Sequence, residues 1–387
     1  MATGLRNPPT LALAARRFGV GLCFYYSSAK GCRVLLRSLI RELPPAYFAL
    51  VMATGIVSIA AYGLGPASIG WGLFGLNLVL YTVLAVLHGL RLMLFPQRCI
   101  VDLFDPSAGP GYFTWIAATA VLGSQCLVLA HAAQVATALF VFAVVLWLLL
   151  NYAVFAALAL RRHKQALDVG INGGWLLAVV AMQGLAVLAT HLAGGWGQPV
   201  RLELHFAALV LWLAGGMLYL WLAALIFYRY YFFALAPGDL VPTYWINMGA
   251  MAISTLAGSL LIAGSSGPAP YLQSLRPFLE GFTLFYWAGG TWWLPLLVIL
   301  GVWRHVIRGY RLVYDPLYWG MVFPLGMYAV ATEHMSRSMG LAFLRPISIV
   351  FLYIALLAWA VTALGLVVAM VTGVRRFATQ LRAAAGD

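Results

Sequence analysis

The stretch from Tyr318 to Met335 has the residue types expected of a gated conduit, because it is apolar enough to cross a bilayer yet has Pro324 in its middle. Proline lacks an N–H and crowds the carbonyl four residues back, at Gly320, so a helix here is predicted to kink. Phe323 precedes this proline, and Gly320 and Gly326 leave its ring room to turn. We predict that Phe323 is an aromatic gate. The alternative is a core or lipid-facing phenylalanine beside an ordinary helix kink.

Uncharged polar groups recur in the other apolar stretches. Hydroxyl, amide and backbone dipoles can conduct an ion without a ring of fixed charge. The alternative is that these residues only make hydrogen bonds between helices. Glu333 and His334 are predicted to form the outer mouth of the conduit. The candidate lining residues are Thr54, Gly55, Ser58, Thr114, Asn172, Gln183, Asn247 and Ser254.

Catalytic and metal-binding patterns do not occur in the sequence. There is no hydrolase, metalloprotease or phosphate-loop motif. Cys23, Cys32, Cys99 and Cys126 have no metal-ligand spacing. No Lys, Arg, Asp or Glu lies deep in an apolar stretch, whereas a proton-driven carrier usually needs an ionisable relay there. We therefore predict no enzyme activity, no catalytic residue, no metal site and no cofactor.

The composition predicts an all-α protein that crosses the lipid bilayer many times. Of the 387 residues, 64% are hydrophobic and only 9% are charged, which excludes an ordinary soluble globule. The net charge of +13 is therefore not read as a sign of nucleic-acid binding. Runs of about 20 apolar residues, each long enough to span the hydrocarbon, predict ten helices at 46–64, 69–93, 112–131, 135–160, 171–191, 204–228, 243–264, 281–303, 317–335 and 347–373.

Loop charges predict the orientation of these helices. All but four of the 23 Lys and Arg residues fall on the side of the membrane that holds the N-terminus. By the positive-inside rule this predicts a multi-pass protein of the cell (inner) membrane with both termini in the cytoplasm. Odd-numbered spans then run outward, so their positive dipole ends face the cytoplasmic mouth and favour anions there. We divide the chain into a basic cytoplasmic segment at 1–41, a ten-helix domain at 42–375 and a short cytoplasmic tail at 376–387. The four exceptions are Arg201, Arg276, Arg337 and Arg345.

Four stretches together resemble the tellurite-resistance/dicarboxylate transporter family, which includes TehA-like proteins, fungal malate and sulfite exporters and plant slow-type anion channels. They are PPAYFALVMATGIVSIA at 44–60, DPSAGPGYFTWIAATAVLGSQ at 105–125, INGGWLLAVVAMQ at 171–183 and DPLYWGMVFPLGMY at 315–328. The resemblance implies five antiparallel helix hairpins around a central pore, odd-numbered helices inside, and a homotrimer. It also implies an occluding phenylalanine in the ninth helix, which is Phe323 here, although Phe206 or another ring could share that role.

Three functions are compatible with these features. The first is a passive anion channel or facilitator for small inorganic anions or carboxylates of the chloride, nitrate, sulfite and malate class. The second is an ion-coupled exporter of a C4-dicarboxylate, sulfite or a toxic oxyanion such as tellurite. The third is a membrane scaffold or sensor without transport.

Overall fold

The computed structural model describes residues 37–265 and 270–385. Every regular element in these ranges is a helix. The long helices are α3 (Ala49–Leu64), α4 (Ala67–Leu94), α6 (Phe113–Val128), α7 (Ala133–Leu160), α9 (Leu177–Ala193), α10 (Val200–Phe232), α11 (Ile246–Gly264), α13 (Arg276–Val302), α14 (Trp319–Ser338) and α15 (Arg345–Ala385). Three short helices lie between them: α5 (Pro96–Leu103), α8 (Leu167–Gly170) and α12 (Pro270–Ser274).

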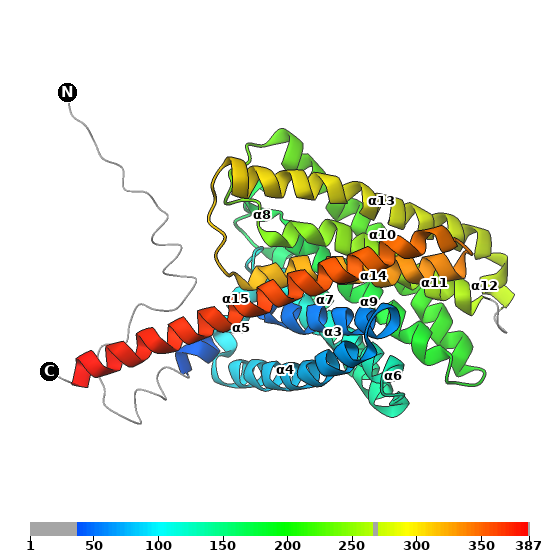
Figure 1. Cartoon of the computed structure of the whole chain (residues 1–387), viewed down its shortest axis with the longest axis horizontal. Coiled ribbons are helices and arrows are strands. Elements are labelled where there is room, and N and C mark those ends of the chain that lie inside the picture. Colours follow the sequence, from blue (N-terminus) through cyan, green and yellow to red (C-terminus); the bar gives the residue numbers. More distant parts are fainter. Residues whose placement is uncertain (1–36, 266–269, 386–387) are drawn as a thin grey trace.

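Nine of the ten predicted membrane-spanning helices agree with the observed ones to within six residues at each end, whereas the last, predicted at 347–373, continues to Ala385 as α15. Within the described ranges, nine long helices are both long and apolar enough to cross a membrane. The tenth, α14, is less apolar because its end carries Glu333, His334 and Arg337. It lies against α3, α11 and α15 (Figure 1). The chain is therefore an all-α polytopic membrane protein.

The long helices form an inner and an outer ring. Neighbouring inner helices pack in the closed order α3, α6, α9, α11, α14 and back to α3. In the most apolar stretch of α3, α6, α9 and α11, between 72% and 94% of the residues are buried. The outer helices α4, α7, α10, α13 and α15 bury only 11% to 39% of theirs, as expected of surfaces that face lipid. This confirms that the odd-numbered helices lie inside.

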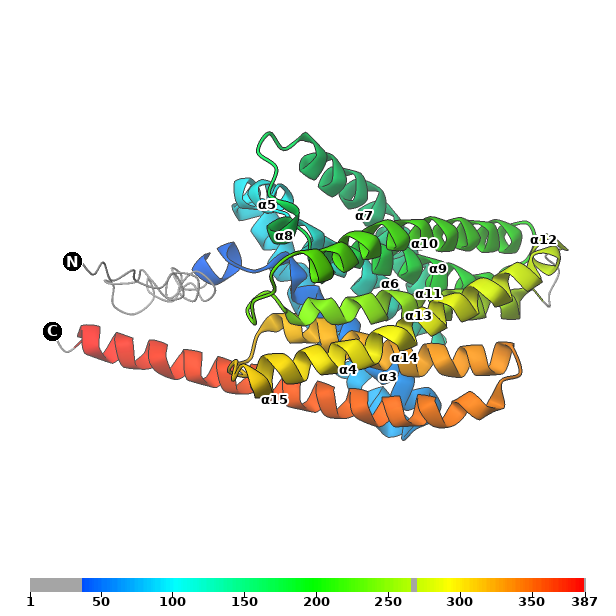
Figure 2. The ribbon, with the colours of Figure 1, turned by 90° about the horizontal axis from the view of Figure 1, so that it is seen from above.

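Consecutive inner and outer helices form the five predicted hairpins. The connection from α3 to α4 is only Gly65 and Pro66, and the connection from α6 to α7 is residues 129–132. Connections at the opposite end of the bundle are longer, and the one after α4 contains α5 (Figure 2). Short connections force each outer helix to pack beside the inner helix that precedes it.

A 3₁₀ turn leads into each inner helix. These turns are η1 (Pro45–Phe48), η2 (Gly109–Tyr112), η3 (Gly173–Leu176), η4 (Pro242–Trp245) and η6 (Pro316–Tyr318). Four of them carry proline in their first two residues, where a missing N–H costs nothing. The recurrence of one turn before five helices reveals a fivefold structural repeat that is not evident in the sequence.

The two ends of the described chain can be compared with the predicted segment boundaries. Residues 37–41 are helical, and the remainder of the predicted basic segment, residues 1–36, lies outside the described residues. Helix α15 is continuous to Ala385, so the proposed boundary between residues 375 and 376 falls within one helix. This helix extends beyond the bundle at the end where α5 lies (Figures 1 and 2).

Candidate functional site

The fivefold repeat gives a common register for the inner helices. Each 3₁₀ turn carries an aromatic residue at an equivalent position, which serves here as the reference position of the repeat. Residues at fixed distances from the reference position lie at the same depth in the ring, because the five helices run in the same direction. The reference residues are Tyr47, Tyr112, Trp175, Tyr244 and Tyr318.

Two cavities lie on the axis of the ring, and both are lined by residues of all five repeats. The first, the N-terminal cavity, has a volume of about 10 Å³. Its lining comes from one or two residues before and two residues after the reference position: Ala46, Ala49, Thr114, Leu177, Thr243, Ile246, Pro316, Leu317 and Gly320. Five helix N-termini converge here, and their partial positive charge favours an anion.

The second, the C-terminal cavity, is larger, with a volume of about 90 Å³, enough for several water molecules. It lies toward the other end of the ring. Its lining comes mainly from residues 9, 12 and 16 positions after the reference: Ile56, Ile59, Ala120, Val121, Ser124, Val128, Gly184, Val187, His191, Ile253, Leu256, Met327, Val330 and His334. The linings of the two cavities include no Asp, Glu, Lys or Arg.

Phe323 belongs to the layer between the two cavities. It lies three residues after Gly320, which lines the N-terminal cavity, and four before Met327, which lines the C-terminal cavity. This spacing keeps all three residues on one face of α14. Phe323 is fully buried. The equivalent residues of the other repeats are Met52, Ala117, Val180 and Gly249, and three of them are also among the fully buried side chains of the core.

Small residues surround this middle layer. One position further along each inner helix stand Ala53, Ala118, Ala181, Ala250 and Pro324. Phe323 is therefore the bulkiest side chain in these two layers. Phe206, the alternative ring, is on the outer helix α10, is 58% exposed and contacts Tyr271, so it is remote from the axis.

The residues around Phe323 have separate roles in packing. Pro324 lies inside α14 as its sixth residue, and its ring packs against Gly249 of α11. Gly326 faces α3, where an added Cβ would lie 3.1 Å from side-chain atoms of Ile56 and Val57. Gly320 lines the N-terminal cavity. The glycines thus let α14 approach its neighbours closely as well as flanking Phe323.

Three of the seven polar candidates bond to outer helices. The Trp359 indole of α15 donates to the Thr54 hydroxyl (3.0 Å), and Ser58 donates to the Gly70 carbonyl of α4 (2.7 Å). Gln183 donates to the Trp212 carbonyl of α10 (3.0 Å). Each bond satisfies a polar group within the bundle, where no water competes.

Three other polar candidates use their side chains within their own helix or turn. Ser254 donates to Ala250 within α11, and its own carbonyl accepts from the Trp212 indole. Asn247 donates to the Tyr244 carbonyl, and the Asn172 side chain accepts from the Gly174 amide. An added Cβ at Gly55 would point at Val121 and Asn77. Of the eight candidates, Thr114 lines an axial cavity, and its hydroxyl donates to the Gly111 carbonyl (2.7 Å).

The two predicted mouth residues face different surroundings. Glu333 is buried and forms an ion pair with Arg337 (2.7 Å), with Arg345 of α15 at 4.0 Å. His334 lines the C-terminal cavity together with His191 of α9. The candidate list omits His191, Ser124 and the aliphatic lining, because polarity alone does not indicate which face of a helix looks inward.

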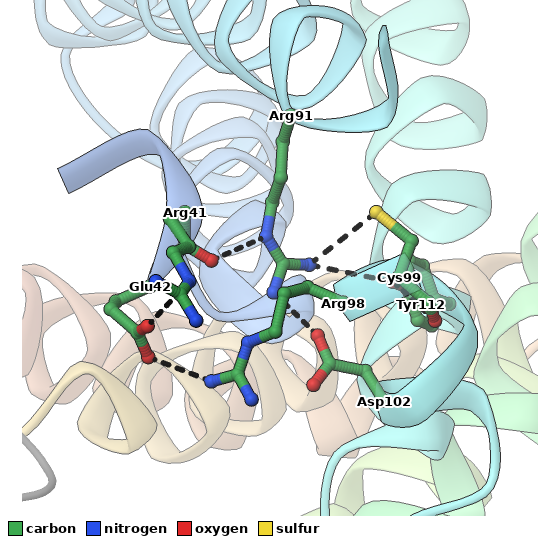
Figure 3. Close-up of polar contacts among 7 residues, drawn as sticks. All are labelled: Arg41, Glu42, Arg91, Arg98, Cys99, Asp102 and Tyr112. Carbon is green, nitrogen blue, oxygen red and sulfur yellow. Dashed lines mark hydrogen bonds and ion pairs between the residues drawn. The ribbon is translucent and has the colours of Figure 1, made fainter. Parts of the chain in front are cut away.

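A buried polar cluster holds the opposite end of the ring. The guanidinium of Arg91, at the end of α4, donates to the Arg41 carbonyl (3.1 Å) and to Asp102 of α5 (2.5 Å) (Figure 3). It also donates to the Tyr112 hydroxyl (3.4 Å), and Tyr112 is the reference residue before α6. The guanidinium of Arg229 in α10 similarly donates to the backbone carbonyl of Asp168 (2.7 Å) and to the Asp239 carboxylate (3.2 Å). These arginines complement helix C-termini and secure the loops beside the N-terminal cavity.

Comparison with known proteins identifies the family. The model of the voltage-dependent anion channel family matches residues 42–367. Two uncharacterized transporters of Methanocaldococcus jannaschii are 25% and 26% identical; each match covers 84% of this chain and 92% or 94% of the relative. An uncharacterized membrane protein of Mycobacterium tuberculosis is 34% identical over 145 residues, which is 38% of this chain and 73% of that protein. The chain belongs to the voltage-dependent anion channel family.

Proposed function

We propose that the protein is a passive anion channel or facilitator whose path follows the axis of the inner ring and whose gate is Phe323. The observation that carries this proposal is the arrangement of two uncharged cavities in line, separated by a layer in which Phe323 is the largest side chain. An uncharged path suits an anion that is stabilised by dipoles along its route and is released readily. Chloride, nitrate, sulfite and malate are the class of substrate that such a path would accept.

Three further features support anions over cations. The N-termini of five inner helices converge on the N-terminal cavity. Buried Arg91, Arg229 and Arg304 lie at the same end of the bundle. No carboxylate lines either cavity, so nothing there would attract a cation.

We also propose that the protein lies in the membrane in the predicted orientation, with both termini in the cytoplasm. Four arginines lie at the ends of helices nearest the C-terminal cavity: Arg201, Arg276, Arg337 and Arg345. The other Lys and Arg residues of the described ranges lie at the opposite end. By the positive-inside rule the N-terminal cavity then opens to the cytoplasm and the C-terminal cavity to the outside of a cell (inner) membrane. A homotrimer, in which each subunit has its own pore, would cover part of the exposed outer ring.

The test is the conductance of Phe323→Ala. Purified protein in planar bilayers, or the protein expressed in oocytes, is compared with wild type in chloride, nitrate, sulfite and malate. We expect an anion current well above that of wild type, because removal of the ring joins the two cavities. Phe206→Ala is the matched control, since it removes an identical ring from the outer surface.

The same recordings distinguish the coupled exporter. A channel gives a reversal potential set by the anion gradient alone. Dependence of net transport on an imposed proton gradient, lost in Glu333→Gln, would favour the exporter of a dicarboxylate, sulfite or tellurite-like oxyanion. If liposomes containing wild-type protein or Phe323→Ala show no anion flux, both the channel and the exporter are contradicted, and the scaffold or sensor is favoured.

A further inference from the structure

The C-terminal cavity has few groups that can bind an ion. Eleven of its fourteen lining residues are glycine or have aliphatic or thioether side chains. The other three are Ser124, His191 and His334. The Ser124 hydroxyl already donates to the Ala120 carbonyl (3.1 Å). The two imidazoles are therefore the main side-chain donors available to an anion in this cavity.

The two histidines occupy equivalent positions of the repeat. Each lies 16 residues after its reference aromatic, His191 on α9 and His334 on α14. These helices flank α11 on opposite sides, and the equivalent residue of α11 is Leu260. Nδ1 of His191 is buried and has no hydrogen-bond partner. An unpartnered buried polar atom beside a cavity is costly unless something in the cavity pairs with it.

The charged groups near this pair do not neutralise a positive charge on it: Arg337 repels a charge on His334, and the two imidazoles repel each other. A bound anion is therefore the group that would stabilise an imidazolium here. Glu333 is the nearest carboxylate, and it is already paired with Arg337 and lies close to Arg345 of α15. On α10, His205 bonds the Arg201 carbonyl and packs against Gly264 at the end of α11. The residues that α3, α6 and α11 contribute to the cavity carry no ionisable group.

We propose that His191 and His334 form an anion-binding site in the C-terminal cavity, and that protonation from the outside strengthens it. A neutral imidazole offers one N–H donor, whereas an imidazolium offers two and a positive charge. The ligand is a small inorganic anion or carboxylate of the class assigned to the path. As a regulation of that path, the inference rests on the proposed function, but binding at the site can be measured without conduction.

Conduction is tested with the gate removed. In the Phe323→Ala background, lowering the external pH from about 7.5 to about 4 should raise the chloride and nitrate current at least about threefold. His191→Gln together with His334→Gln should abolish this rise. The reversal potential should remain set by the anion gradient, which separates pH-dependent binding from proton coupling. His131→Asn is the control, because His131 is exposed in the turn after α6 and has φ of 53°, which asparagine tolerates.

Binding is tested on the otherwise wild-type protein in detergent. Nitrate should raise the thermal unfolding temperature at about pH 4 more than at about pH 7.5, and the variant with both histidines changed to glutamine should lose the difference. A nitrate effect equal in the variant and in wild type overturns the proposal, as does a current in Phe323→Ala that is independent of external pH. If Phe323→Ala carries no current but the nitrate effect depends on both histidines, the site stands and the channel proposal fails.

Discussion

Gly249 of α11 lies directly against the ring of Pro324 in α14, so that a Cβ added at Gly249 would come within 2.6 Å of Pro324 Cγ. Both residues are buried, and they belong to the layer of Phe323 or to the position next to it. Because proline cannot move independently of its backbone, the contact fixes the separation of α11 and α14 at the depth of the proposed gate. The position of the gate helix thus depends on the absence of a single methyl group.

Gly249→Ala should destabilise the protein. The new methyl group must push α14 away from α11, and overpacking of this kind costs roughly 1–3 kcal/mol. Thermal unfolding in detergent measures the loss. Gly75→Ala is the control, because Gly75 is exposed on α4 and an added Cβ there meets no atom within 4 Å. Equal unfolding temperatures for both variants would show that α14 can shift freely.

A ring placed on the opposite side of the middle layer should replace Phe323. Ala117 of α6 occupies the equivalent position in its repeat, and α6 does not neighbour α14 in the ring. Adding Ala117→Phe to Phe323→Ala should return the anion current most of the way to the wild-type level. Single-channel or bilayer current is the readout.

The control for this rescue is Ala153→Phe in the same background, because Ala153 is exposed on α7. It should leave the current of Phe323→Ala unchanged. If Ala117→Phe also leaves the current unchanged, the two residues do not share one constriction.

Substitutions at two threonines should distinguish a residue that bonds between helices, Thr54, from a residue that lines the path, Thr114. Thr54→Val removes the acceptor for the Trp359 indole, so it should cost roughly 1–2 kcal/mol of stability without changing anion selectivity. Thr114→Val removes the hydroxyl from the N-terminal cavity and should reduce the current of Phe323→Ala. If the lost hydroxyl weakens the binding free energy of the ion by about 1 kcal/mol, the affinity for the ion falls about fivefold. A selectivity change in the Thr54 variant alone would contradict this assignment.

The buried Arg91 cluster and a neighbouring surface ion pair should differ in their contributions to stability. Arg91→Ala leaves Asp102 and the Tyr112 hydroxyl without their buried partner, and we expect a loss of roughly 2–4 kcal/mol in the free energy of unfolding. Arg98→Ala removes the exposed pair with Glu42 and should cost less than about 1 kcal/mol. Chemical denaturation in detergent compares the two. Similar losses would mean that Arg91 is not the anchor of this end of the bundle.

The sequence alone determined the number and hairpin pairing of the long helices and the approximate position of each. Long apolar runs and the positions of Lys and Arg are local properties, and the bilayer requires each run to form a complete helix. The motif around Phe323 and Pro324 could likewise be located from residue types. Gly320, predicted to flank the gate, and Thr114, predicted to line the path, both line the N-terminal cavity.

Only the tertiary structure decided which face of each inner helix looks toward the axis. Inner helices are apolar on all sides, so no hydrophobic stripe indicates an orientation. A polar residue such as Gln183 or Ser58 can satisfy its hydrogen bonds toward the axis or toward an outer helix, and here both bond outward. His191 and His334 meet at one cavity because five distant segments close into a ring in a common register, which no single segment encodes.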